Sequence, residues 1–183
     1  MQAAIGSQLS IVSLKEAGID IEIPEPFDTL EQNAQEKCSV IASLVKKSCF
    51  SEDTGLEVDA LNGAPGVLSA RYAAEDPDFD DNISKLLFNL QQSNSRKARF
   101  RTVIALNWEG EMHFFEGICE GYILTERSGN SGFGYDPVFQ PQESLKSFAE
   151  MTMDEKNIYS HRRKAADKLV LFLQQRIGLI TIS

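Results

Sequence analysis

The sequence lacks three features that would each indicate a common class of protein: a long apolar run, paired cysteines and a basic surplus. No stretch approaches the roughly 20 consecutive apolar residues that span a bilayer, and the N-terminus lacks the basic and apolar segments of a secretory signal. The three cysteines are widely spaced, with no Cys-x-x-Cys pair. This pattern argues against a disulfide framework or a thiolate zinc site, and we expect free, buried thiols in a reducing cytosol.

The charge balance restricts the partners. With 18 basic and 27 acidic side chains, the formal net charge is −9. Broad binding to nucleic acid needs many basic side chains to displace counterions, so it is not expected. One small polyanion in a local cationic pocket remains open, and a metal ion would then help to offset the repulsion.

Several nucleotide and hydrolase motifs are also absent. The chain contains no Gly-x-x-x-x-Gly-Lys-Ser/Thr loop, no strand-linked Gly-x-Gly-x-x-Gly and no serine nucleophile elbow. A P-loop, a Rossmann dinucleotide site and a serine hydrolase triad are therefore not indicated.

What is present is an ordinary globular composition, with 42% hydrophobic and 25% charged residues. Its 183 residues suit one domain over residues 1–183. Periodicity predicts a helix from Leu30 with Thr29 as its N-cap, and a last helix opened by a Thr152–Glu155 capping box. Helices interleave with strands, which favours an α/β or α+β class with a mixed sheet. The other predicted elements are a helix at 80–92, strands at 8–14, 48–53 and 56–61, and a hairpin of 98–108 with 111–124.

The first feature that departs from scaffold chemistry is Glu52-Asp53-Thr54-Gly55. Adjacent residues of a strand point to opposite faces, so both acids can share one site only where the strand ends. Gly55 suits such a turn. A solvated turn with two surface acids explains the same residues, and this segment alone does not exclude it.

The second feature is the loop SGNSGFGYDP at residues 128–137. Its serines and glycines let backbone approach a ligand closely. Phe133 and Tyr135 could stack on a base, and Asp136 could accept hydrogen bonds from ring or exocyclic N–H groups. The alternative is a hairpin exit with both aromatic rings in the core.

The third feature is the segment DEKNIYSHRRKAADK at residues 154–168. Cations in the first turns of a helix oppose the helix dipole, and a bound anion would remove that conflict. The alternative is an exposed basic face paired with neighbouring acids. The residues that form the cationic set are Lys156, His161, Arg162, Arg163 and Lys164.

Six segments in order resemble the inosine triphosphate pyrophosphatase family, specifically its bacterial dITP/XTP pyrophosphatases. They are DTLEQNAQEK, EDTGLEVDALNGAPGVLSARYA, RKARF, EGICEGYI, GFGYDPVF and DEKNIYSHR, and the likeness runs from about Ser10 to Leu173. The resemblance implies an elongated, two-lobed α/β fold: a mixed β-sheet flanked by helices, with a nucleotide cleft between the lobes. It also implies Mg²⁺ dependence, a cytoplasmic homodimer, and hydrolysis of dITP, ITP or XTP to the monophosphate and pyrophosphate.

The resemblance also assigns residues by motif position. Asp53 is similar to the family's proton acceptor and magnesium-site residue, and Glu25 to its second magnesium carboxylate. The residues that would contact substrate are Thr54, Phe133, Gly134, Tyr135, Asp136, Lys156, His161 and Arg162. A metal ion lowers the pKa of bound water, which makes a nearby carboxylate an adequate proton acceptor.

The sequence departs from the family pattern at its start. The family begins with a strand and a Ser/Thr-x-Asn-x-x-Lys phosphate loop, whereas MQAAIG resembles only the tail of the helix that follows them. Two alternatives to the assigned activity follow from this departure and from the breadth of the fold. One is a catalytically impaired nucleotide-binding protein, and the other is a related pyrophosphatase that prefers pyrimidine or standard nucleotides.

Overall fold

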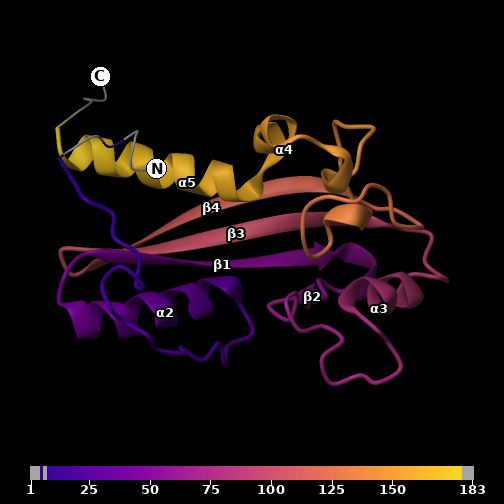
Figure 1. Cartoon of the computed structure of the whole chain (residues 1–183), viewed down its shortest axis with the longest axis horizontal. Helices are drawn as coiled ribbons and strands as arrows, with labels where there is room; N and C mark the ends of the chain where they lie inside the picture. The colour runs from indigo at the N-terminus through magenta and orange to yellow at the C-terminus, as the bar shows by residue number, and fades with distance from the viewer. Residues whose placement is uncertain (1–4, 6–7, 179–183) are drawn as a thin grey trace.

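The computed structural model describes Ile5 and residues 8–178, and its centre is a five-stranded sheet in the order β2-β1-β3-β4-β5 (Figure 1). The strands are β1 (Cys49–Val58), β2 (Pro65–Gly66), β3 (Lys97–Trp108), β4 (Glu111–Ile123) and β5 (Phe139–Pro141). Every pairing among these described strands is antiparallel, whereas the sequence predicted a mixed sheet. The predicted hairpin is confirmed, and its two-residue turn at Glu109-Gly110 has positive φ at both positions, as such turns require.

Two long helices cover opposite faces of this sheet (Figure 1). Helix α2 (Leu30–Val45) packs on Val103 and Ala105 of β3, and α5 (His161–Arg176) packs on Ile104 and Leu106. Because successive residues of a strand face opposite sides, the two helices sandwich the same stretch of β3. The predicted N-cap is confirmed, since the Thr29 hydroxyl accepts from the Gln32 amide.

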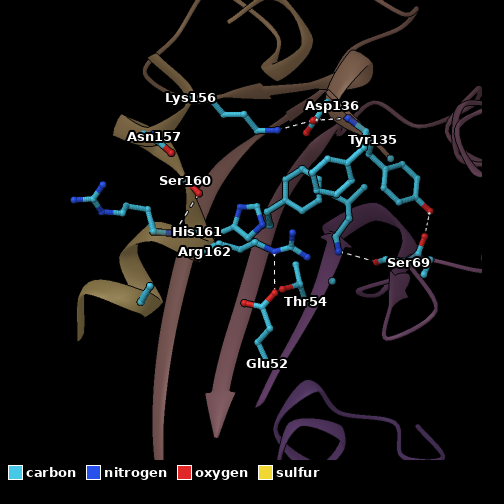
Figure 2. A pocket seen from close by; sticks show the side chains of 18 of the residues that line it. Glu52, Thr54, Ser69, Tyr135, Asp136, Lys156, Asn157, Ser160, His161 and Arg162 are labelled. Atoms are coloured by element: carbon cyan, nitrogen blue, oxygen red, sulfur yellow. Dashed lines mark hydrogen bonds and ion pairs between the residues drawn. The ribbon is translucent and has the colours of Figure 1, made fainter. Parts of the chain in front are cut away.

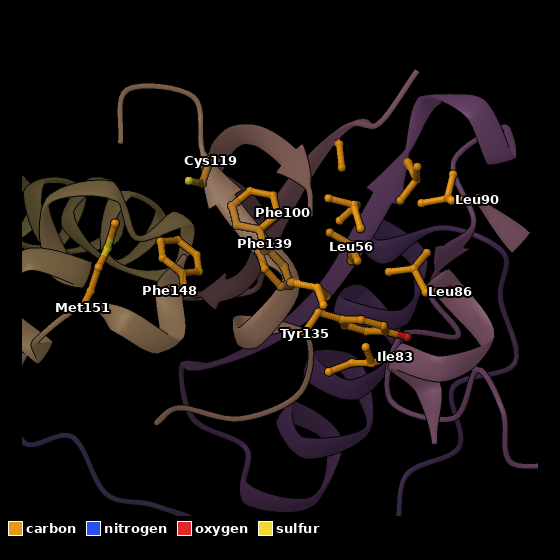
Figure 3. Packing of buried hydrophobic residues seen from close by; sticks show 14 residues of the cluster. Leu56, Ile83, Leu86, Leu90, Phe100, Cys119, Tyr135, Phe139, Phe148 and Met151 are labelled. Carbon is orange, nitrogen blue, oxygen red and sulfur yellow. The ribbon is translucent and has the colours of Figure 1, made fainter. Parts of the chain in front are cut away.

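A second core lies at the other end of the sheet, beside α3 (Asn82–Asn89). Figure 3 shows Leu56 of β1 and Leu86 of α3 beside Tyr135, with Phe100, Phe139 and Phe148 farther along the same cluster. The clusters at the two ends of the sheet correspond to the two lobes that the family resemblance implied. No helix within the described residues is long and apolar enough to cross a membrane.

Four predicted elements are wrong in type or extent. The last helix is two helices, α4 (Met153–Tyr159) and α5, because Ser160 leaves helical geometry and its hydroxyl caps the amide of Arg163. Residues 8–14 form no strand, and the chain turns at Ser13, whose amide and hydroxyl both donate to Glu16. The strands predicted at 48–53 and 56–61 are one continuous strand, β1. The predicted helical start at residues 1–6 lies, apart from Ile5, outside the described residues.

Candidate functional site

The acidic pair lies in the middle of β1 rather than at a strand end. The ladder between β1 and β3 runs unbroken from Cys49 to Val58, so Glu52 and Asp53 point to opposite faces. The predicted strand end at the acidic pair is therefore wrong, and the condition under which both acids could share one site is not met. Gly55 does not form a turn; a Cβ there would lie 2.5 Å from the carbonyl oxygen of Gly66, so glycine permits the close approach of β2.

On the α2 face, one lysine joins two carboxylates from distant parts of the chain. Lys37 Nζ lies 2.5 Å from Glu25 Oε1 and 2.9 Å from Asp53 Oδ1. Arg71 Nη1 adds a third, longer contact, 3.5 Å from Glu25 Oε2. Sequence reasoning paired Glu25 with Asp53 but missed Lys37. Lys37 stands eight residues into α2, one turn after the buried Asn33, and no pattern in the sequence singles it out.

The two carboxylates differ in their electrostatic environment. Burial raises the pKa of Asp53, and the opposing hydrogen bond and charge of Lys37 do not fully cancel that effect. Burial also acts on Glu25, but its bonds to Lys37 and Arg71 outweigh it and lower the pKa of Glu25. Burial disfavours the charged form of Lys37 too, yet its two carboxylate partners raise its pKa. Asp53, only 9% exposed, is thus the more readily protonated of the two acids.

These residues fit a sparse divalent-cation site. The carboxylates of Glu25, before α2, and of Asp53, in β1, both contact one cation, the ammonium of Lys37. Among the described residues no group of three or more His, Cys, Asp or Glu side chains could enclose a metal. Magnesium suits such a pair, because it keeps waters and takes phosphate oxygens as further ligands.

The α5 face of β1 borders a cavity of about 550 Å³ (Figure 2). Its walls come from β1, β3, the 128–137 loop and the start of α5, and they are mainly apolar. All eight of the predicted substrate residues line it. They are Thr54, Phe133, Gly134, Tyr135, Asp136, Lys156, His161 and Arg162.

The two aromatic residues of the loop have different positions. Phe133 is 68% exposed at the cavity mouth, with the ammonium of Lys156 5.2 Å from its ring centroid. Tyr135 is buried in the core, and its hydroxyl donates to the carbonyl of Ser69 at 3.0 Å. Phe133 is therefore free to stack on a base, whereas Tyr135 supports the wall.

Asp136 is the polar centre of this loop. Its side chain is buried, receives the Phe133 amide at 2.9 Å and lies 2.5 Å from Lys156 Nζ. Gly132 makes room for it, since a Cβ there would meet Asp136 Oδ2 at 2.2 Å. The pair offers both an acceptor and donors to a ligand at the cavity wall.

His161 differs from the predicted cation. Burial, and then the positive charges of Arg162, Lys156 and Lys164, lower the pKa of its imidazole to about 3. The neutral ring stacks on Phe100, with centroids 4.7 Å apart and planes at 11°. Its Nδ1 is buried and has no hydrogen-bond partner among the described residues.

The remaining basic residues of the segment divide between the cavity and the surface. Arg162 Nε lies 3.3 Å from Glu52 Oε1, which places this ion pair at the cavity edge (Figure 2). Arg163 pairs with Asp167, and Lys164 donates to the carbonyl of Ile118. The predicted pairing with a neighbouring acid is thus correct for Arg163, which also borders the cavity together with Lys156 and Arg162.

Comparison with known proteins gives a consistent result. Residues 1–172 match the model of the Ham1 family. The chain is 50% identical over 167 residues to the dITP/XTP pyrophosphatase of Porphyromonas gingivalis, covering 91% of this chain and 86% of that protein. It is 45% identical over 170 residues to the protein of the same name from Flavobacterium johnsoniae, covering 93% and 88%.

Solved structures agree with this fold. The Ham1 protein of Staphylococcus aureus superposes with a TM-score of 0.87 and 36% identity, over 94% of this chain and 90% of that one. The nucleoside-triphosphatase, or dITP/XTP pyrophosphatase, of Mycobacterium abscessus superposes with a TM-score of 0.76 and 38% identity, over 89% and 87%.

Proposed function

The chain belongs to the Ham1 family, and on that premise we propose that it hydrolyses dITP, ITP and XTP to the monophosphate and pyrophosphate. The observation that carries the proposal is the placement of chemistry on the two faces of β1. Paired carboxylates lie on one face, and a cavity with an exposed aromatic ring lies on the other. Such an enzyme would remove non-standard purine nucleotides from the nucleotide pool.

The geometry of β1 gives a substrate a route between the two faces. Strand β2 pairs with β1 only at Leu56 and Glu57, so the outer edge at Glu52–Gly55 has no strand partner within the described residues. In our proposal the base occupies the cavity and the triphosphate crosses this edge towards Asp53. Thr54, at the crossing, would contact the substrate between the two ends.

Asp53 is the proposed proton acceptor. A bound Mg²⁺ would supply the lowered pKa of the attacking water and charge neutralisation for the phosphates. Glu25 and Asp53 would hold it, and the raised pKa of Asp53 makes this carboxylate a better acceptor than an exposed aspartate. Lys37, between the two acids, reduces their mutual repulsion and would donate to a phosphate oxygen.

The cavity residues support recognition of a deaminated purine. A purine of this kind carries a carbonyl oxygen at C6 where adenine carries an amino group, and Lys156 and Arg162 supply donors for it. Asp136 would accept a ring N–H, Phe133 would stack on the base, and the buried Nδ1 of neutral His161 is free for a further hydrogen bond. Gly134 and Tyr135 would shape the same wall.

The resemblance also supports three further proposals. They are magnesium dependence, a cytoplasmic location, and a homodimer whose subunit is the single domain of residues 1–183. Each is a separate question from the reaction itself. Metal removal by chelation, cell fractionation and sedimentation would answer them in turn.

Product analysis tests the reaction. The purified chain is incubated with XTP, dITP, ATP or dUTP in the presence of Mg²⁺ or a chelator, and pyrophosphate and orthophosphate are both quantified. We expect pyrophosphate from XTP and dITP only, at rates at least tenfold above those for ATP and dUTP, and none with the chelator. Orthophosphate alone, preference for dUTP, or nucleotide binding without turnover would contradict the proposal and favour one of the alternatives.

A further inference from the structure

The carboxylate of Glu25 lies in a segment with little structure of its own. Residues 19–26 form neither helix nor strand. Pro24 and Pro26 flank Glu25 and carry no backbone N–H, so the segment cannot be fixed there by a regular hydrogen-bond ladder. Something outside the segment must therefore hold Glu25 at its place beside Lys37 and Asp53.

The side chain of Asn33 supplies that contact. Its Oδ1 accepts the amide N–H of Phe27 at 3.0 Å, and its Nδ2 donates to the carbonyl of the same residue at 3.0 Å. The two bonds form a two-point clamp on the residue that is two positions beyond Glu25. Asn33 is fully buried in the first turns of α2, so its own position is fixed by the helix.

The helix that carries Asn33 also reaches the second carboxylate. A primary amide has two N–H groups and one oxygen, and Phe27 uses one of each. Lys37, one helical turn further along α2, then contacts both acids.

We propose that Asn33 is a positioning residue that sets the distance between Glu25 and Asp53 and thereby the affinity of the site for a divalent cation. This proposal rests on the metal site of the proposed function. One buried amide holds the loop that carries Glu25 to α2, and the same helix carries Lys37, which contacts both carboxylates. Residues that orient metal ligands in this way typically alter metal affinity by about 10- to 100-fold when they are replaced.

The arrangement separates this role from general support of the fold. Phe27 is 38% exposed and belongs to none of the buried hydrophobic clusters of the described residues, so loss of its two bonds to Asn33 leaves the core contacts of α2 in place. We therefore expect Asn33→Ala to loosen the 19–27 segment while α2 and the sheet remain folded. The variant would lose the fixed position of Glu25 relative to Asp53 and keep its folded state.

The test measures metal binding without nucleotide. Binding of Mn²⁺ to the full chain is followed by electron paramagnetic resonance of the free ion, for the unsubstituted protein and for Asn33→Ala. We expect Asn33→Ala to bind Mn²⁺ at least about 10-fold more weakly than the unsubstituted protein does. The matched control is Asn89→Ala, which removes a side-chain amide bond to the Tyr72 hydroxyl in the other lobe and should bind Mn²⁺ normally.

A second pair of variants acts from the loop side and leaves the buried helix unchanged. Phe27→Pro removes the N–H that the clamp holds, whereas Phe27→Ala keeps it and removes only the ring. We expect Phe27→Pro to weaken Mn²⁺ binding as Asn33→Ala does, and Phe27→Ala to leave it within about twofold. This pair decides the question if Asn33→Ala does not fold.

Hydrogen exchange gives a readout independent of the metal. In Asn33→Ala the Phe27 amide should exchange rapidly, while the amides of α2 stay protected. Unchanged exchange at Phe27, or unchanged Mn²⁺ affinity in both Asn33→Ala and Phe27→Pro, would overturn the proposal and leave the proposed reaction intact. Absence of Mn²⁺ binding by the unsubstituted chain would instead contradict the metal site itself, and this proposal with it.

Discussion

At the scale of single residues, His161 is the clearest case of an environment that changes a side chain's chemistry. The sequence places His161 between Lys156 and Arg162 and predicts it as part of a cationic set. In the folded chain His161 is buried against Phe100 and stays neutral. Its contribution to the cavity is therefore a stacking surface and a free ring nitrogen, not a positive charge.

This protonation state predicts a pH dependence of stability. The pKa of His161 is about 3 in the folded chain and near 6.5 when unfolded, so the unfolded state binds the extra proton between these values. The contribution of the neutral His161 ring to the free energy of unfolding is fully present above pH 6.5 and is lost as pH falls towards 3. Melting temperatures of the unsubstituted protein and of His161→Phe, which keeps the stacked ring, are measured from pH 4 to 7. On acidification the melting temperature should fall less steeply in His161→Phe than in the unsubstituted protein. Parallel curves for the two proteins would contradict the neutral state.

At the scale of elements, β1 determines the site because it runs through the acidic pair without a break. Its register with β3 places Asp53 towards α2 and Glu52 towards α5. Its close contact with β2 needs a residue without a side chain at position 55. The short β2 then leaves the edge at Asp53 open.

Gly55→Ala tests this contact. The added Cβ would meet the backbone carbonyl of Gly66 at 2.5 Å, so β2 must move although the φ of Gly55 suits any residue. We expect a loss of about 1–3 kcal/mol in the free energy of unfolding, from steric overlap alone. Urea titration measures it, and a loss under about 0.5 kcal/mol would show that β2 is not held against β1.

The sequence predicts elements better than it predicts their ends. Helix α2 follows from its periodicity and from Thr29, and the hairpin follows from Glu109-Gly110 between two apolar strands. The break at Ser160 was missed because the apolar spacing continues across it. Glu52 and Asp53 were placed at a strand end because two adjacent acids and a glycine are typical of a turn, and only the pairing with β3 shows otherwise. Lys37 could not be assigned, since its partners lie 12 and 16 residues away in sequence.

At the scale of the whole molecule, the sheet separates two kinds of chemistry in a chain of net charge −9. Such a surface repels a nucleotide triphosphate at long range, so the binding that we propose would depend on the local cations of the site and on a metal ion. Those cations come from α2 and from the α4–α5 segment, on opposite faces of one strand (Figure 1). The central claim of this account is that the neighbouring acids Asp53 and Glu52 therefore have unequal roles.

The most direct test compares Asp53→Asn with Glu52→Gln in magnesium-dependent release of pyrophosphate from XTP. Asp53→Asn removes the proposed proton acceptor, and we expect kcat to fall by about 10²- to 10⁴-fold. Glu52→Gln removes only a half-exposed ion pair with Arg162, which is worth about 1 kcal/mol or less, so kcat/KM should change by no more than about fivefold. Equal losses in the two variants, or an active Asp53→Asn enzyme, would contradict the account.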